Sequence, residues 1–118
     1  MEPSIPEIHS GLHLARALFY EFLGTALIVY AYNFTATSFF GRGFAYFVGW
    51  LIAVSISGAH FNPATTLGVY LAEGKYVRQI GRLLLYIFVQ FCGGFLGIFF
   101  TWLVFKAPIQ GFLLWPAI

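Results

Sequence analysis

Charged side chains are scarce in this chain. Its 118 residues include six lysines and arginines and four aspartates and glutamates, whereas 60% of the residues are hydrophobic. The net charge of +2 gives no basic surface for nucleic acid, so we expect no nucleic-acid partner. A composition this apolar lies outside the range of soluble globular domains and is typical of an integral membrane protein. It does not identify which membrane.

Cysteine is almost absent as well. The single residue of this type, Cys92, has no partner for a disulfide within the chain. We find no nucleophile–base–acid set and no phosphate-binding loop, so the sequence predicts that the chain is not an enzyme and needs no cofactor. His9 and His13 are four residues apart, but Pro6 precedes them and no third ligand is near, which favours a solvated tail over a metal site.

Three apolar runs account for most of the chain. A helix needs about 20 apolar residues to cross a bilayer, and the runs over 14–36, 44–56 and 83–105 are predicted to be such helices. The second run could also begin nearer Phe39. The stretch Lys75–Arg82 reads as an amphipathic hinge that leads into the third run.

The connection between the first two runs is short. The predicted turn falls within 37–43, where Ser38, Gly41 and Gly43 are the only helix breakers. So short a connection leaves the outer surface of a helical bundle open to a neighbour.

A small, polar stretch separates the second and third runs. Asn62 suits the N-cap of a helix and Pro63 suits the first helical position, and the helix they begin, 64–70, is ended by Ala72-Glu73-Gly74. Non-helical backbone at membrane depth persists only where protein buries it or water lines it. The sequence therefore predicts a re-entrant half-helix over 57–71 that borders a cavity.

One charged residue lies inside the first apolar run. A carboxylate near the membrane interior costs about 2.5–3.5 kcal/mol on insertion scales, so Glu21 should face protein and have partners there. The alternative is that Glu21 lies near the interface and extends to water.

Several of these stretches together resemble a known family. The string from Ser57 to Thr66, SGAHFNPATT, resembles the first signature of the aquaporin and glycerol-facilitator (major intrinsic protein) family, S-G-x-H-x-N-P-A-V-T, with Thr65 where valine is usual. Glu21 to Thr25 resembles the family's first-helix signature, and Tyr86 to Gln90 resembles its third-helix signature.

The resemblance covers the first half of the family's architecture. It implies an all-α membrane protein with three transmembrane helices and a re-entrant NPA half-helix, that is, half of an aquaporin-like fold. We expect one domain over 1–118, with an N-terminal arm over 1–13, a helical bundle over 14–105 and an apolar tail over 108–118.

The resemblance also implies the site. The loop would offer a solute the Asn62 amide as a donor and backbone carbonyls as acceptors, and the half-helix would point its partial positive charge at the membrane midplane. The implied pore residues of this loop are Gly58, Ala59, His60, Asn62, Pro63 and Ala64. Glu21 and Gln90 would brace the loop.

Arg42 aligns with a filter position of the family and is therefore a candidate constriction. The alternative is a residue at the membrane edge that extends its charge to water. Gly93 and Gly97 supply a small-residue face for close helix packing, either inside the chain against Gly24 or against a partner.

Two functions remain open at this point. The chain could be a half-channel that, paired with an identical or separately encoded second half, passes water or small neutral solutes passively. It could instead be a non-conducting structural subunit of a larger membrane complex, such as an energy-transducing complex of an organellar inner membrane. The expected partners are membrane lipid and either a second half-channel or other membrane subunits.

Overall fold

The computed structural model describes residues 10–35 and 38–105 and contains four helices there: α1 (Ser10–Phe34), α2 (Phe39–Ser57), α3 (Pro63–Glu73) and α4 (Tyr76–Phe105). Helices α1, α2 and α4 are long and apolar enough to cross a membrane. This all-α arrangement of three spans and a shorter helix confirms the predicted fold. Most of the predicted arm, 1–9, and the tail 108–118 lie outside the described residues.

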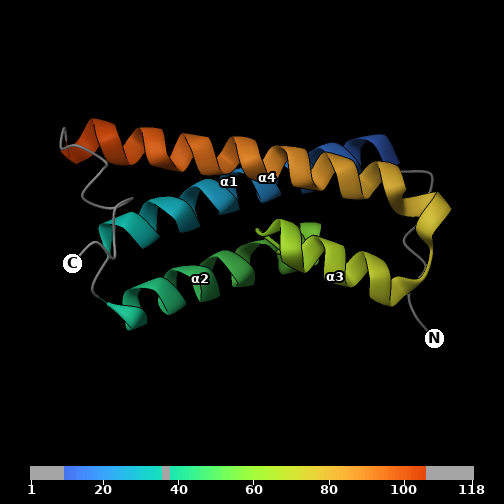
Figure 1. Cartoon of the computed structure of the whole chain (residues 1–118), viewed down its shortest axis with the longest axis horizontal. Helices are drawn as coiled ribbons and strands as arrows, with labels where there is room; N and C mark the ends of the chain where they lie inside the picture. The colour runs from blue at the N-terminus through green and yellow to red at the C-terminus, as the bar shows by residue number, and fades with distance from the viewer. Residues whose placement is uncertain (1–9, 36–37, 106–118) are drawn as a thin grey trace.

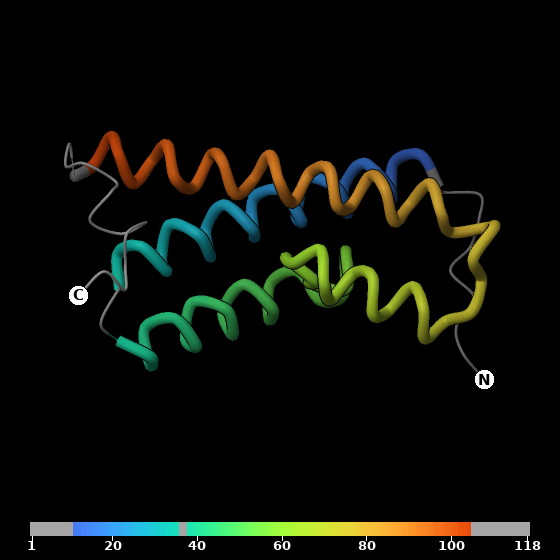
Figure 2. The backbone as a smooth tube through the Cα atoms, viewed as in Figure 1, coloured from blue at the N-terminus to red at the C-terminus, as the bar shows by residue number. Residues whose placement is uncertain are grey.

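The helices form two rows along the long axis of the molecule. Helices α1 and α4 lie side by side in one row, and α2 and α3 follow one another in the other (Figure 1). Helix α3 begins near the middle of the long axis, beside the end of α2 (Figure 2). The loop 58–62 that joins them is therefore at mid-depth in the bundle.

Glycines allow α4 to pack closely on α1. A Cβ atom at Gly93 would lie 2.3 Å from the backbone oxygen of Phe22, and one at Gly97 would lie 2.6 Å from that of Ala26. The predicted packing face thus lies inside the chain, but Gly24 is not its partner. A Cβ at Gly24 would lie 2.0 Å from the Phe61 ring, so this glycine makes room for the loop instead.

The second span begins at Phe39, which confirms the earlier of the two predicted starts, so most of the predicted turn over 37–43 is helical. Helix α2 already begins at Phe39, because the Ser38 hydroxyl caps it by accepting a hydrogen bond of 3.1 Å from the Gly41 amide. Gly41 and Gly43 therefore lie within α2. A Cβ at Gly41 would approach the Thr35 side chain to 2.8 Å, so this glycine allows a close approach and does not break the helix.

The boundaries around α3 also differ from the prediction. Helix α3 continues past Tyr70 to Glu73, where Gly74 ends it in the left-handed conformation with φ of 68°. Helix α4 begins at Tyr76, so the predicted hinge over Lys75–Arg82 is almost wholly helical. Only Gly74 and Lys75 join the two helices.

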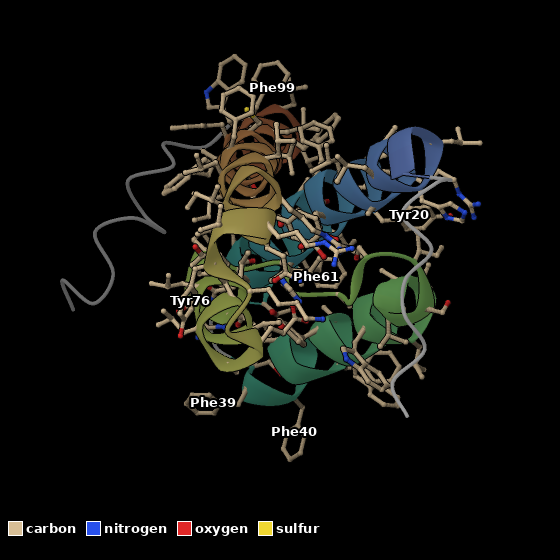
Figure 3. All side chains as sticks on the ribbon, turned by 90° about the vertical axis from the view of Figure 1, so that its right-hand side faces the viewer. Tyr20, Phe39, Phe40, Phe61, Tyr76 and Phe99 are labelled. Atoms are coloured by element: carbon tan, nitrogen blue, oxygen red, sulfur yellow. The ribbon has the colours of Figure 1, made fainter. Side chains whose placement is uncertain are left out.

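The outer faces of the bundle are apolar. Phe39, Phe40 and Phe99 point away from the helices, whereas Phe61 lies at the centre of the end-on view (Figure 3). Phe40 is 91% exposed and Phe61 only 4%. In a membrane these outer rings meet lipid or other chains, and the chain is an integral membrane protein.

Candidate functional site

The loop 58–62 has a strained backbone. Gly58 caps α2 with φ of 90°, and the next positive values belong to Ala59 (53°) and Phe61 (54°), which are not glycines. Such a conformation costs about 1–3 kcal/mol at each non-glycine residue and persists only where the surroundings fix it. The contacts of the loop should therefore include some that hold this backbone in place.

The main contact is a carboxylate from α1. Glu21 is fully buried and accepts four hydrogen bonds, two on each oxygen. The donors on Oε1 are the Ser57 hydroxyl at 2.6 Å and the His60 amide at 3.0 Å. Those on Oε2 are the Phe61 amide at 2.7 Å and the Gln90 side-chain amide at 2.8 Å.

Consecutive backbone N–H groups turned to one side form a concavity that binds an anion. Here the anion is part of the protein. The positive φ angles aim the amides of His60 and Phe61 at Glu21, and the four donors replace the water that a carboxylate would lose on burial. The hydrogen bonds to Glu21 therefore offset both the strain in the loop and the cost of burying the charge.

A second set of hydrogen bonds joins the loop to α3 and α4. The Gln90 amide also donates to the Thr66 hydroxyl at 2.9 Å, and the Nδ1 atom of His60 lies 3.1 Å from the same hydroxyl. Thr66 in turn donates to the Asn62 carbonyl at 3.1 Å. One connected network thus links α1, the loop, α3 and α4.

Tyr86 secures the end of α2 from the α4 side. Its hydroxyl donates to the Ser57 carbonyl at 2.8 Å and accepts from the Arg82 guanidinium at 3.3 Å, and the side chain is only 2% exposed. The sequence alone does not predict that Tyr86 holds the end of α2. The available signal was its position four residues before Gln90, which puts the two polar groups on one face of a helix.

Asn62 begins α3. Its side-chain Oδ1 accepts the Ala64 amide at 2.8 Å, and Pro63 takes the first helical position. Asn62 is exposed, and its Nδ2 group has no hydrogen-bond partner among residues 10–35 and 38–105. The structure therefore presents one side-chain donor beside the positive end of the α3 dipole.

The carbonyl groups expected to line a path have different surroundings. The His60 carbonyl accepts a hydrogen bond of 2.9 Å from the Tyr46 hydroxyl of α2. Ala59 is buried, and Gly58 borders a hollow of about 270 Å³. This hollow lies between the last turn of α2, the loop, α3 and the first turns of α4, and its lining includes His60 and Arg82.

Arg42 is not part of this cluster. It lies in the first turn of α2, whereas the loop follows the last turn of the same helix. Its guanidinium carbon lies 3.8 Å from the centre of the Tyr32 ring on α1. The structure therefore brings Glu21, Gln90 and the loop together and places Arg42 at the other end of α2.

Known proteins match the chain over most of its length. The sequence profile of the family described as Major intrinsic protein matches residues 8–113. The chain is 36% identical over 105 residues to the glycerol uptake facilitator protein of Streptococcus pneumoniae strain R6, covering 75% of this chain and 44% of that protein.

It is also 34% identical over 109 residues to aquaporin-3 of Milnesium tardigradum, covering 75% of this chain and 32% of that protein. To aquaporin-1 of Rhizopus delemar it is 32% identical over 76 residues, which are 64% of this chain and 24% of that protein. The chain spans less than half the length of these curated relatives. No solved structure gives a significant match.

Proposed function

The chain belongs to the major intrinsic protein family, and from this membership we propose that it supplies one half of an aquaporin-like channel for water or small neutral solutes. Members of this family are channels, so we propose passive transport and no enzymatic activity. Relatives named glycerol uptake facilitator and aquaporin support this solute class.

The observation that carries the proposal is the donor at Asn62 on a strained, braced loop. Glu21 and the Gln90 amide hold the loop so that α3 begins at mid-depth, and the Asn62 amide stays exposed beside the helix N-terminus. A neutral solute can replace part of its hydration with this donor and with carbonyl acceptors of the loop. A cation would instead meet the positive end of the helix dipole.

A second half must complete such a path. In inverted-repeat membrane proteins the halves are related by a pseudo-two-fold axis in the membrane plane, with the site at their interface. An identical copy would have to insert upside down. Helices α1 and α4 begin at the same end of the bundle, and α2 begins at the other end (Figure 1). Arg16 lies near the start of α1, and Lys75, Arg78 and Arg82 lie at or near the start of α4, whereas Arg42 lies near the start of α2. This uneven distribution of positive charge resists inversion only weakly. We therefore favour a second half of different sequence, on the same or another polypeptide.

Substitution of Asn62 tests the proposal. We would compare osmotic swelling of vesicles that contain the assembly with wild-type chain, Asn62→Asp or Asn62→Ser. Both substitutions keep an oxygen that can cap α3, and both remove the amide donor. We expect solute permeability to fall in both variants, and cation leak to rise only with aspartate.

The control is Thr65→Val, an exposed position on α3 where the family usually has valine. It should leave permeability unchanged. If a conducting assembly keeps its permeability with Asn62→Asp, this loop does not line the path. Absence of conduction by the native assembly would reject the proposed function altogether.

A structural role is the second candidate. The short connection between α1 and α2 leaves Phe39 84% and Phe40 91% exposed, as a docking surface for another subunit would require. The native mass of the assembly in mild detergent separates the two candidates. Many unrelated subunits would favour the structural role, whereas a small assembly with one second half would favour the channel.

A further inference from the structure

Tyr46 contacts the loop from α2, and Tyr86 contacts the residue just before it from α4. Each hydroxyl donates to a backbone carbonyl, that of His60 at 2.9 Å for Tyr46 and that of Ser57 at 2.8 Å for Tyr86. Their burial differs greatly, since Tyr86 is 2% exposed and Tyr46 is 36% exposed. Tyr86 is thus part of the packed interior, whereas the bond from Tyr46 lies on an open face.

Residues four apart share one side of a helix, so Arg42, in the first turn of α2, and Tyr46, beside the loop, lie on the same side of α2. The Tyr46 ring meets the Phe61 ring edge-on, with centroids 6.0 Å apart and planes at 75°. Phe61 itself is buried over Gly24, so it fixes the position of the Tyr46 ring.

The hydroxyl changes what the loop offers to a solute. A carbonyl oxygen has two lone pairs, and Tyr46 occupies one of them at His60. A phenylalanine could make the same edge-on contact with Phe61, so ring packing alone does not account for the hydroxyl. Its bond to an exposed carbonyl places a bulky group where the proposed path needs an acceptor.

We propose that Tyr46 is a specificity-determining residue of the channel. Its hydroxyl occupies one lone pair of the His60 carbonyl, and its half-exposed ring, packed on Phe61, adds bulk beside the loop, so water passes in preference to larger polyols such as glycerol. This inference rests on the proposed function, which it deepens by naming the solute that is favoured.

The test measures water and glycerol permeability of the same vesicles. Tyr46→Phe removes only the hydroxyl and keeps the ring contact, and Tyr46→Val also removes the ring. Because one hydrogen bond becomes available to the solute, Tyr46→Phe should raise the glycerol-to-water permeability ratio about two- to tenfold. Tyr46→Val should raise the ratio further, because the approach is also wider.

Tyr70→Phe is the matched control. The Tyr70 hydroxyl also donates from an exposed site to a backbone carbonyl, that of Tyr76 at 2.8 Å, but it lies at the far end of α3. If the wild type conducts and both Tyr46 variants show the same glycerol-to-water permeability ratio as Tyr70→Phe, this inference is overturned. The proposed function then still stands. If neither wild type nor any variant conducts, both proposals fail.

Discussion

Glu21→Gln removes the charge at the centre of the network while keeping nearly the same shape. The carboxylate accepts four hydrogen bonds, whereas a glutamine offers one acceptor oxygen and one donor group. The cost of the substitution therefore depends on which of the four donors can find another acceptor.

Each placement of the new amide leaves one backbone donor unpaired. If its NH₂ group faces Phe61 and Gln90, the Gln90 amide can flip and present its Oε1, which is buried without a partner among the described residues, although its bond to the Thr66 hydroxyl is then lost. The Phe61 N–H then faces a donor. If NH₂ faces the other pair, the Ser57 hydroxyl can turn to the Ala53 carbonyl at 3.4 Å, and the His60 N–H is left unpaired.

Either placement of the amide lowers the free energy of unfolding by a similar amount. An unpaired buried donor costs about 1–3 kcal/mol, and the surviving bonds lose the strength that a charged acceptor gave them. We expect Glu21→Gln to lower the free energy of unfolding by about 2–4 kcal/mol, within the range for loss of one partner from a buried polar network. Glu21→Ala leaves all four donors unpaired and should cost more.

The assay is reversible unfolding in mixed micelles, followed by the far-ultraviolet circular dichroism of the helices. Glu73→Gln is the control, because Glu73 is exposed at the end of α3. This substitution should change the free energy of unfolding by at most about 0.5 kcal/mol. Amide exchange at His60 and Phe61 should also accelerate in Glu21→Gln. Equal stability of the two variants, with unchanged exchange, would refute the role assigned to the carboxylate.

Three further changes test the packing and the caps by the same unfolding assay. Gly93→Ala should lower the free energy of unfolding by at least about 1–3 kcal/mol, because its Cβ would lie 2.3 Å from an α1 carbonyl oxygen. Gly94→Ala is the control and should be near neutral, because the nearest atom to its Cβ would be 4.0 Å away. Equal effects of the two substitutions would contradict this packing. Tyr86→Phe should cost about 1 kcal/mol through loss of the bond to the Ser57 carbonyl, and an unchanged midpoint would show that this bond contributes nothing. Asn62→Ala should cost about 0.5–2 kcal/mol as a lost N-cap, and serine at this position should recover most of that stability.

The sequence predicted the helices better than their ends. Apolar runs of membrane length and the Asn62-Pro63 pair follow from local chemistry, so the three spans and the start of α3 were readable. Gly41 was read as a breaker, but it lies in α2 and packs on Thr35. A glycine that permits a close approach looks the same in a sequence as one that ends a helix, because only the neighbour distinguishes them.

The candidate site shows the same limit. Glu21 stood out as a carboxylate in an apolar run, but its side-chain donors Ser57 and Gln90 lie 36 and 69 residues along the chain. Nothing in one sequence pairs residues so far apart without a resemblance to guide it. The chain has seven tyrosines, and composition could not single out Tyr46 and Tyr86 as the two that donate to the carbonyls of His60 and Ser57.

The position of Glu21 in the chain has a consequence for biogenesis. Helix α1 precedes α2, α3 and α4 in the chain and therefore carries its carboxylate before any of the four donors has been synthesised. Insertion of this helix alone should cost about 2.5–3.5 kcal/mol for the unpaired charge, a cost that later segments offset only as the loop and α4 arrive. Nascent chains that stop before Ser57 should therefore insert α1 less efficiently than the same chains with Glu21→Leu. Equal insertion would mean that lipid headgroups or the insertion machinery shelter the carboxylate until its partners emerge.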